Sequence, residues 1–156
     1  MTVPIPPLPD LSLTVASRFV AASGLVVEEV TDSRVRGHVD LSEDHHSPWG
    51  VVHGGVYTSI VESAGSIGAS YAVAERAEFA VGVHNATDFL RPATAGRALV
   101  EAVALHQGRT QQLWQVVITD EATSKIIARG QLRLQNVALR GAQPSSPGGA
   151  DRKRGN

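Results

Sequence analysis

The residues best suited to chemistry in this chain are a histidine beside two glycines, a glutamate and a serine. His53, which can act as an acid, a base or an orienting group, precedes Gly54 and Gly55. If a helix starts at these glycines, its first N–H groups are free to bind a developing oxyanion. Glu62 and Ser66 lie four residues apart and would share one face of that helix. Such a carboxylate and hydroxyl can together hold and activate one water molecule.

The spacing between His53 and Glu62 bears on how a site could be assembled. Nine residues of helix turn through about 900°, which leaves the two side chains roughly half a turn apart. We therefore expect them to face apart in one chain, and two chains would build a site that uses both more easily. Each also has a simpler interpretation, His53 as a loop histidine with satisfied hydrogen bonds and Glu62 as a solvated residue. The second is weakened by apolar or small neighbours, namely Ile60, Val61, Ala64 and Ile67.

Other familiar chemistries fit this sequence less well. His45 and His46 are adjacent, so they would point apart in an extended segment, and no third histidine stands at ligand spacing. A bound metal is therefore not expected. No serine occupies a G-x-S-x-G elbow, which argues against a serine-hydrolase triad. Gly54 and Gly55 alone are too short a stretch to cradle phosphates as a nucleotide-binding loop does.

The composition indicates one domain and excludes several partners. The chain has 156 residues, 42% of them hydrophobic, which is enough for a real core. A net charge of −1 and an aromatic content of 4% do not suggest nucleic acid or a membrane surface as partner. The chain has no cysteine, no apolar run of about 18 residues and no basic start typical of a signal peptide. We expect a cytoplasmic protein.

The hydrophobic pattern predicts two short strands, a long helix and four long strands, preceded by a short helix. Residues 1–10 are rich in proline and residues 140–156 form a basic, Gly- and Pro-rich tail, so both are expected to be disordered around a domain at 11–139. The expected helices are Leu11–Ala22, capped by Ser12 or Thr14, and Val56–Ala74. The expected strands are Leu25–Val30, Arg34–Leu41, Phe79–Phe89, Arg97–Gln107, Thr110–Asp120 and Lys125–Val137, with a loop at Glu43–Gly55.

Several short motifs occur in a fixed order along this framework. They are Trp49–Gly55, Glu62–Ser66, Val81-Gly82, Asn85, Phe89–Pro92, Gly96 and His106–Thr110, followed by Gln112 and Trp114. In this order and spacing, they resemble the hotdog-fold acyl-CoA thioesterases over about residues 19–137. The subgroup that the chain resembles most contains the 4-hydroxybenzoyl-CoA thioesterases of the phenylacetate-pathway type and the 1,4-dihydroxy-2-naphthoyl-CoA thioesterases.

The resemblance implies an α+β fold in which a curved antiparallel sheet wraps a long central helix. Two such units pair into a continuous sheet, commonly within a tetramer, and active sites form at the dimer interface. The implied reaction is hydrolysis of an acyl-CoA, with an aromatic acyl group preferred and no cofactor besides the coenzyme A of the substrate. The alternative is a non-catalytic hotdog module that binds acyl-CoA or an acyl carrier.

Matched position by position, the resemblance also assigns roles to residues of this sequence. Glu62 corresponds to the catalytic carboxylate, as nucleophile or as general base, and Gly54 to the N–H donor that polarises the thioester carbonyl. His53 corresponds to an orienting histidine and Ser66 to the hydroxyl that binds the hydrolytic water. Arg91 and Arg109 are the natural phosphate ligands. The full substrate-binding set is Ser47, Gly82, Phe89, Leu90, Arg91, Pro92, His106, Gly108, Arg109 and Thr110.

One position departs from the pattern of the subgroup. Relatives usually carry Gln or Asn six residues before the motif histidine, where the amide helps to polarise the carbonyl. This chain has Ser47 there. A hydroxyl can still reach through a water, or His46 can take over, so the departure bears on rate and acyl preference more than on the class of reaction.

Overall fold

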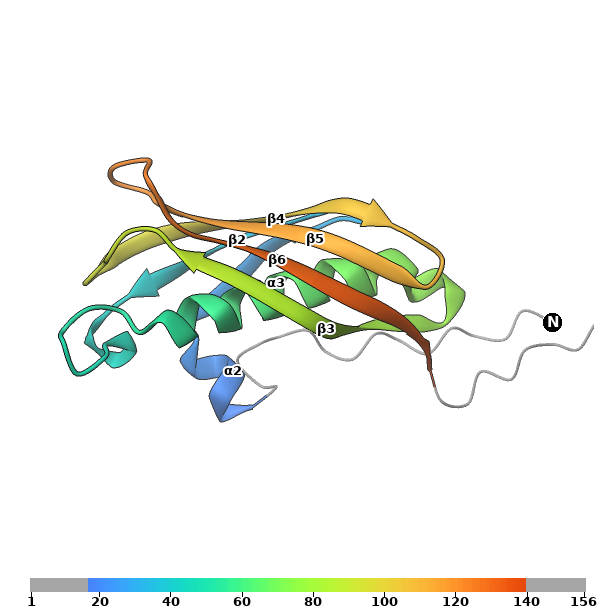
Figure 1. The fold of residues 1–156 in the computed structure, drawn as a ribbon, viewed down its shortest axis with the longest axis horizontal. Helices are drawn as coiled ribbons and strands as arrows, with labels where there is room; N and C mark the ends of the chain where they lie inside the picture. Colours follow the sequence, from blue (N-terminus) through green and yellow to red (C-terminus); the bar gives the residue numbers. More distant parts are fainter. Residues whose placement is uncertain (1–16, 140–156) are drawn as a thin grey trace, which may run out of the picture.

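One long helix lies against a single six-stranded sheet in the computed structural model, which describes residues 17–139 (Figure 1). The helix is α3, and a short helix α2 and two turns of 3-10 helix, η1 and η2, flank it. The helical elements are α2 (Arg18–Ala22), η1 (Glu43–His45), α3 (Gly54–Val73) and η2 (Ala74–Arg76). The strands are β1 (Leu25–Val30), β2 (Arg34–Leu41), β3 (Glu78–Phe89), β4 (Gly96–Gln107), β5 (Gln111–Asp120) and β6 (Ile126–Ala138).

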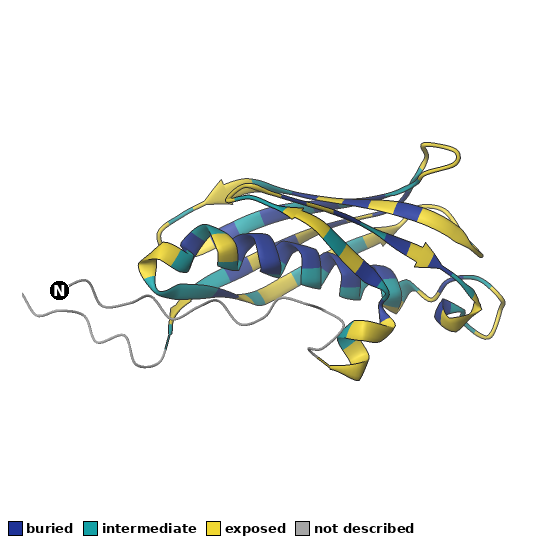
Figure 2. Ribbon diagram, turned by 180° about the vertical axis from the view of Figure 1, so that it is seen from behind, coloured by how far each residue is buried: buried dark blue, intermediate teal, exposed yellow. Residues whose placement is uncertain are grey.

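The sheet is antiparallel throughout, with strand order β1-β2-β4-β5-β6-β3. This order leaves β1 and β3 at the two edges, and α3 covers one face of the sheet (Figure 1). The face of α3 that meets the sheet is buried along most of its length (Figure 2). The predicted α+β hotdog architecture, a long helix wrapped by a curved antiparallel sheet, is confirmed.

Small residues let α3 approach the sheet closely. A Cβ on Gly68 would lie 2.5 Å from the ring of Trp114, and a Cβ on Gly65 would lie 2.7 Å from Leu132. The sheet makes room in the same way, because a Cβ on Gly130 would lie 2.8 Å from Val61. The glycines that lower the helix propensity of this segment are therefore placed where side chains from the sheet need the space.

A buried polar network joins the second half of α3 to the sheet. Gln112 is 1% exposed, and its Nε2 donates to Ala69 O at 2.9 Å and to Asn136 Oδ1 at 2.8 Å. Trp114 Nε1 donates to Gln112 Oε1 at 2.9 Å. Every polar group of the Gln112 amide is therefore satisfied inside the core, as buried polar groups require.

The ends of the elements differ from the sequence prediction at a few places. Helix α2 starts at Arg18, where Ser17, in extended conformation, caps it by accepting a 3.1 Å hydrogen bond from Val20 N–H, so a helix continuous over Leu11–Ala22 is not formed. The predicted caps Ser12 and Thr14 lie outside the described residues. The long helix begins two residues early, at Gly54, and the expected loop before it contains η1. All strand ends agree with the sequence prediction within one residue.

Some predictions concern parts of the chain that the structure does not describe. The disordered termini predicted at 1–10 and 140–156 lie outside residues 17–139, and so does the start of the domain predicted at 11–139. Within the described residues, no helix is long and apolar enough to cross a membrane.

Candidate active site

His53 caps the start of α3. Its backbone is extended (φ −67°, ψ 133°), and its Nδ1 accepts the N–H of Gly55 at 2.9 Å. An accepting Nδ1 carries no proton, so this arrangement assigns the proton of a neutral imidazole to Nε2. The side chain is exposed, so this N–H donor is open to a ligand.

Gly54, the first residue of α3, presents a free backbone N–H. No acceptor for this group is found among residues 17–139, as expected for the first turn of a helix. The ring of Phe89 covers the residue so closely that a Cβ at position 54 would lie 2.5 Å from it. Only glycine fits there, and the helix dipole adds positive potential at the same place.

A cavity of about 230 Å³ opens at this helix start. Apolar side chains and the backbone of Gly54 dominate its lining, which consists of Val51, Val52, Gly54, Tyr57, Phe89, Leu90, Arg91 and Pro92. The rings of Tyr57 and Phe89 lie 6.1 Å apart, centroid to centroid. The structure therefore brings Gly54 together with the predicted binding segment Phe89–Pro92.

Glu62 lies two turns further along α3, half-buried against β3. Its Oε2 accepts a 3.0 Å hydrogen bond from Asn85 Nδ2, which also donates to Thr58 O at 3.2 Å. Thr87 Oγ1 donates to Asn85 Oδ1 at 2.7 Å. The threonine thereby fixes which end of the amide faces the carboxylate, and the amide fixes the carboxylate.

Gly82 and Ser66 complete the surroundings of Glu62. A Cβ on Gly82 would overlap Glu62 Oε1, so the carboxylate occupies the space that a side chain on β3 would otherwise fill. Ser66 is half-buried one helical turn after Glu62, and its hydroxyl has no hydrogen-bond partner within the described residues. Of the predicted residues, Glu62, Ser66 and Gly82 thus form a second group.

The two groups are separated along α3. Nine residues of helix rise about 13 Å, so His53 and Glu62 of one chain cannot both touch one thioester carbonyl. The half-turn rotation that the sequence analysis assigned to them does not apply, because His53 precedes the helix with extended backbone. The separation of His53 and Glu62 along the helix axis still supports the expectation that a site using both is built more easily from two chains.

The predicted residues His106, Gly108, Arg109 and Thr110 lie at the other end of the helix. His106 lies near the end of β4, and the other three form the turn between β4 and β5, where Arg109 O accepts hydrogen bonds from Arg76 and Asn136 at 3.2 and 3.0 Å. A 20-residue helix spans about 30 Å. Arg91 and Arg109 of one chain are therefore too far apart to bind the same phosphate group.

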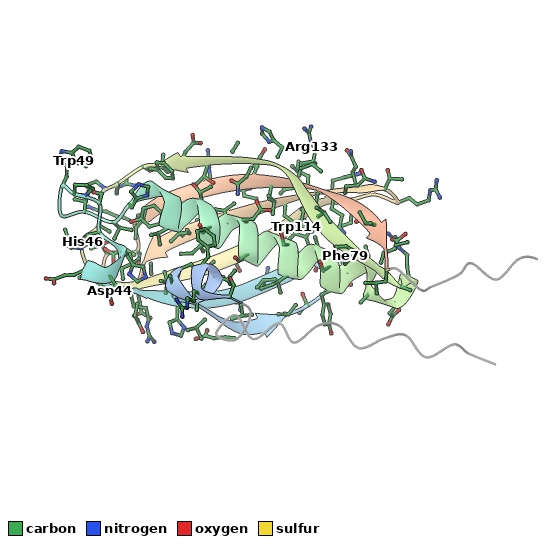
Figure 3. The ribbon with its side chains drawn as sticks, turned by 90° about the horizontal axis from the view of Figure 1, so that it is seen from below. Asp44, His46, Trp49, Phe79, Trp114 and Arg133 are labelled. Atoms are coloured by element: carbon green, nitrogen blue, oxygen red, sulfur yellow. The ribbon has the colours of Figure 1, made fainter. Side chains whose placement is uncertain are left out.

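Ser47 and His46 form hydrogen bonds within the loops near the helix start. Ser47 Oγ accepts a 3.4 Å hydrogen bond from Trp49 N–H, and His46 Nε2 donates to Thr94 O at 2.7 Å. Trp49 is 84% exposed at the tip of its loop and does not line the cavity (Figure 3). No three His, Cys, Asp or Glu side chains of residues 17–139 gather closely enough to hold a metal ion.

Two functional candidates gained their roles only from the structure. Asn85 belonged to the motif set, but its contact with Glu62 depends on a β-bulge between Gly82 and His84 that shifts the register of β3. Tyr57 is buried, and burial raises the pKa of its hydroxyl to about 12. Nothing in the sequence indicated that this hydroxyl is enclosed.

A long helix wrapped by a single curved antiparallel sheet is the architecture that the resemblance to the hotdog-fold thioesterases predicted. The family model of the thioesterase superfamily matches residues 50–127. The chain belongs to this superfamily.

Individual relatives agree with this assignment. The "Putative esterase Rv1847" of Mycobacterium tuberculosis is 41% identical over 138 residues, which cover 86% of this chain and 98% of the relative. A 1,4-dihydroxy-2-naphthoyl-CoA hydrolase of Listeria monocytogenes is 33% identical over 104 residues, which cover 67% of this chain and 83% of the relative. The crystal structure of S. sahachiroi AziG superimposes with a TM-score of 0.74 at 38% identity, covering 79% of this chain and 98% of AziG. The protein is a thioester hydrolase.

Proposed function

We propose that this thioester hydrolase cleaves acyl-CoA thioesters with a compact, aromatic acyl group. The observation that carries the proposal is the cavity of about 230 Å³ beside the free N–H of Gly54. An apolar cavity of about 150 Å³ suffices for benzene, so this one suits a substituted ring better than a long alkyl chain. The similarity to a hydrolase of an aromatic acyl-CoA supports the same class of substrate.

In the proposed reaction, the thioester carbonyl oxygen accepts the N–H of Gly54. The helix dipole and this donor stabilise the oxyanion that forms on attack, and one such donor is typically worth about 3 kcal/mol. Glu62 removes a proton from a water held with the help of Ser66, or attacks the carbonyl carbon itself. If Glu62 acts as the base, it passes this proton to the departing thiolate as the C–S bond breaks. If Glu62 attacks, the C–S bond breaks to give a mixed anhydride, and water then hydrolyses the anhydride, restores the carboxylate and supplies the proton of the CoA thiol. His53 orients the thioester through Nε2–H.

We further propose that each site is shared by two chains. Gly54 and Glu62 of one chain are about 12 Å apart along α3, so the N–H donor and the attacking group come from different copies. The open edge of β3 supports such pairing, because Val81 and Val83 on it are 41% and 53% exposed. Antiparallel pairing of two β3 edges makes the two α3 helices antiparallel. The turn containing Arg109 then approaches the Arg91 end of the other chain, in a dimer or a dimer of dimers.

A thiol-release assay over a panel of aryl and aliphatic acyl-CoA thioesters tests the substrate class. We expect turnover of benzoyl-type thioesters, with kcat/KM falling as the acyl chain lengthens beyond what the cavity holds. A preference for long-chain acyl-CoA would refute the aromatic assignment. Binding without turnover on every member of the panel would instead identify a non-catalytic acyl-CoA module.

Mixing subunits tests the shared site. His53→Ala and Glu62→Ala chains, each impaired alone, should recover activity when they exchange into mixed dimers, because one of the two sites then keeps both groups. If His53→Ala is only mildly slow, a bulkier change at the helix start takes its place. Recovery no greater than the average of the two homodimers, on subunits shown to exchange, would place the whole site within one chain.

A further inference from the structure

The hydroxyl group of Tyr57 is buried without a hydrogen-bond partner. Tyr57 is 2% exposed, and its Oη is the one side-chain nitrogen or oxygen enclosed among the described residues for which no partner is found. Other enclosed polar side chains, such as Gln112, are bonded. A buried hydroxyl left unpaired costs about 1–3 kcal/mol, so an orphan in a well-packed domain calls for a functional explanation.

The surroundings of Tyr57 show where a partner could come from. The residue lines the cavity at the start of α3 together with Gly54 and Phe89, and the other walls from Val51, Val52, Leu90 and Pro92 are apolar. Its ring stands 6.1 Å from the ring of Phe89. One end of this cavity holds the free N–H proposed to bind the thioester oxygen, so the acyl group fills the remaining space against Tyr57.

We propose that Tyr57 selects the acyl group: its enclosed O–H turns into the cavity and donates to an oxygen substituent on the ring, such as a hydroxyl, when one is bound there. The inference rests on the proposed function, because it places the acyl group in this cavity. It goes further by naming the side chain that contacts the ring and by stating that the ring must carry a hydrogen-bond acceptor. The raised pKa of Tyr57 fits this role, since the hydroxyl stays protonated and remains a donor throughout the physiological range.

The expected selectivity follows from the hydrogen bonds that the ring substituent and the Tyr57 hydroxyl gain or lose on binding. A ring oxygen that meets Tyr57 exchanges water for the tyrosine hydrogen bond, whereas an unsubstituted ring leaves the hydroxyl as unpaired as before. A neutral hydrogen bond of this kind corresponds to about a three- to tenfold preference in affinity. Replacing Tyr57 with Phe removes the donor but keeps the ring and its packing against Phe89.

The test uses thioether analogues that cannot be hydrolysed, S-phenacyl-CoA and its ortho-, meta- and para-hydroxylated forms. Calorimetric affinities are measured for the wild-type protein, for Tyr57→Phe and for Tyr71→Phe, a matched control because Tyr71 is the other tyrosine of the chain and is exposed. We expect the wild type and Tyr71→Phe to prefer one hydroxylated isomer by about three- to tenfold. Tyr57→Phe should bind that isomer and the unsubstituted analogue with equal affinity.

Two results would overturn the inference. One is a wild-type protein that binds all four analogues equally, and the other is a preference that survives in Tyr57→Phe. Thermal unfolding gives an independent check, because a Tyr57→Phe midpoint well below that of the wild type would mean that the hydroxyl is already bonded in the free protein. The corresponding thioesters, assayed for hydrolysis by the wild type, test the proposed function separately from the affinity ratio.

Discussion

The two halves of α3 meet the sheet in different ways. In the second half, Gly68 seats the ring of Trp114, and the Gln112 amide is fully bonded between helix and sheet. In the first half, the Gly54 N–H and the Tyr57 hydroxyl have no partners within residues 17–139, and a cavity opens beside them. One helix thus has a half whose buried polar contacts with the sheet are hydrogen-bonded and a half that leaves donors for something else.

The difference shows how one element can serve both stability and function. The satisfied half fixes the position of the helix against the sheet, so the first half can keep unpaired groups without losing its place. Glu62 sits between the two, with its carboxylate held by Asn85 but not enclosed. Substitutions in the first half should therefore mainly change activity, and substitutions in the second half should mainly change the free energy of unfolding.

The largest effect on activity is expected at Glu62. Glu62→Gln and Glu62→Ala should each lower turnover of an aryl-CoA by about 10²–10⁴-fold, the usual loss on removing an acid–base group, without lowering the free energy of unfolding. Ser66→Ala should cost less, because water can partly position itself. Glu75→Gln, on the exposed η2 turn, is the control. Steady-state activity within a few-fold of the wild type would remove Glu62 from the mechanism.

The largest effect on stability is expected at Trp114. Trp114→Ala should lower the free energy of unfolding by about 3–5 kcal/mol, because it opens a large cavity and leaves Gln112 Oε1 without a donor. Trp49→Ala should change it by less than about 0.5 kcal/mol, since that side chain is exposed. Denaturant unfolding measures both. Similar losses for the two variants would contradict the packing described for the second half.

A smaller effect is expected for Asn85, which positions the carboxylate. Asn85→Ala should lower kcat by about 10- to 100-fold, as hydrogen bonds to charged groups are worth about 1.5–3 kcal/mol, and should change KM little. Thr87→Val, which frees the amide to turn, should cost less. A change in KM alone would show that Asn85 contacts the substrate and does not orient Glu62.

The smallest effect is a pH dependence from Tyr57. Its pKa is raised from 10.0 to about 12 by burial, so the unfolded chain ionises first and stability is lost as the pH rises from 10 toward 12. Over that window the wild type should lose up to about 2 kcal/mol more than Tyr57→Phe. Tyr71→Phe should follow the wild type. Parallel curves for wild type and Tyr57→Phe would contradict the enclosed hydroxyl.

Sequence patterns predicted the framework well because the fold depends on local periodicity. The alternation in Arg34–Leu41 and the uninterrupted small-residue segment after Gly55 are signals that need no knowledge of partners. The helix predicted at Leu11–Ala22 is interrupted at Ser17, and nothing in the apolar pattern showed that this serine would cap a helix.

The candidate site was predictable in its residue types but not in its contacts. The hydrogen bond between Glu62 and Asn85 requires the β-bulge in β3. A bulge changes how two strands pair, and a single sequence does not show where this happens. The opposite placement of Arg91 and Arg109 likewise follows from strand order alone. The enclosed hydroxyl of Tyr57 depends on how Phe89 folds over the helix start, which only coordinates reveal.

The closeness of Gly82 to Glu62 has a consequence for how this chain could diverge. The hydrogen of Gly82 leaves room for the carboxylate, and a methyl group there would push it aside while the backbone of β3 stays in its ladder. Glycine and alanine codons differ by a single nucleotide. A descendant could thus lose hydrolysis and keep its acyl-CoA pocket in one mutational step, without any change to Glu62 itself. Among such relatives, an intact glutamate would be no guarantee of an active enzyme.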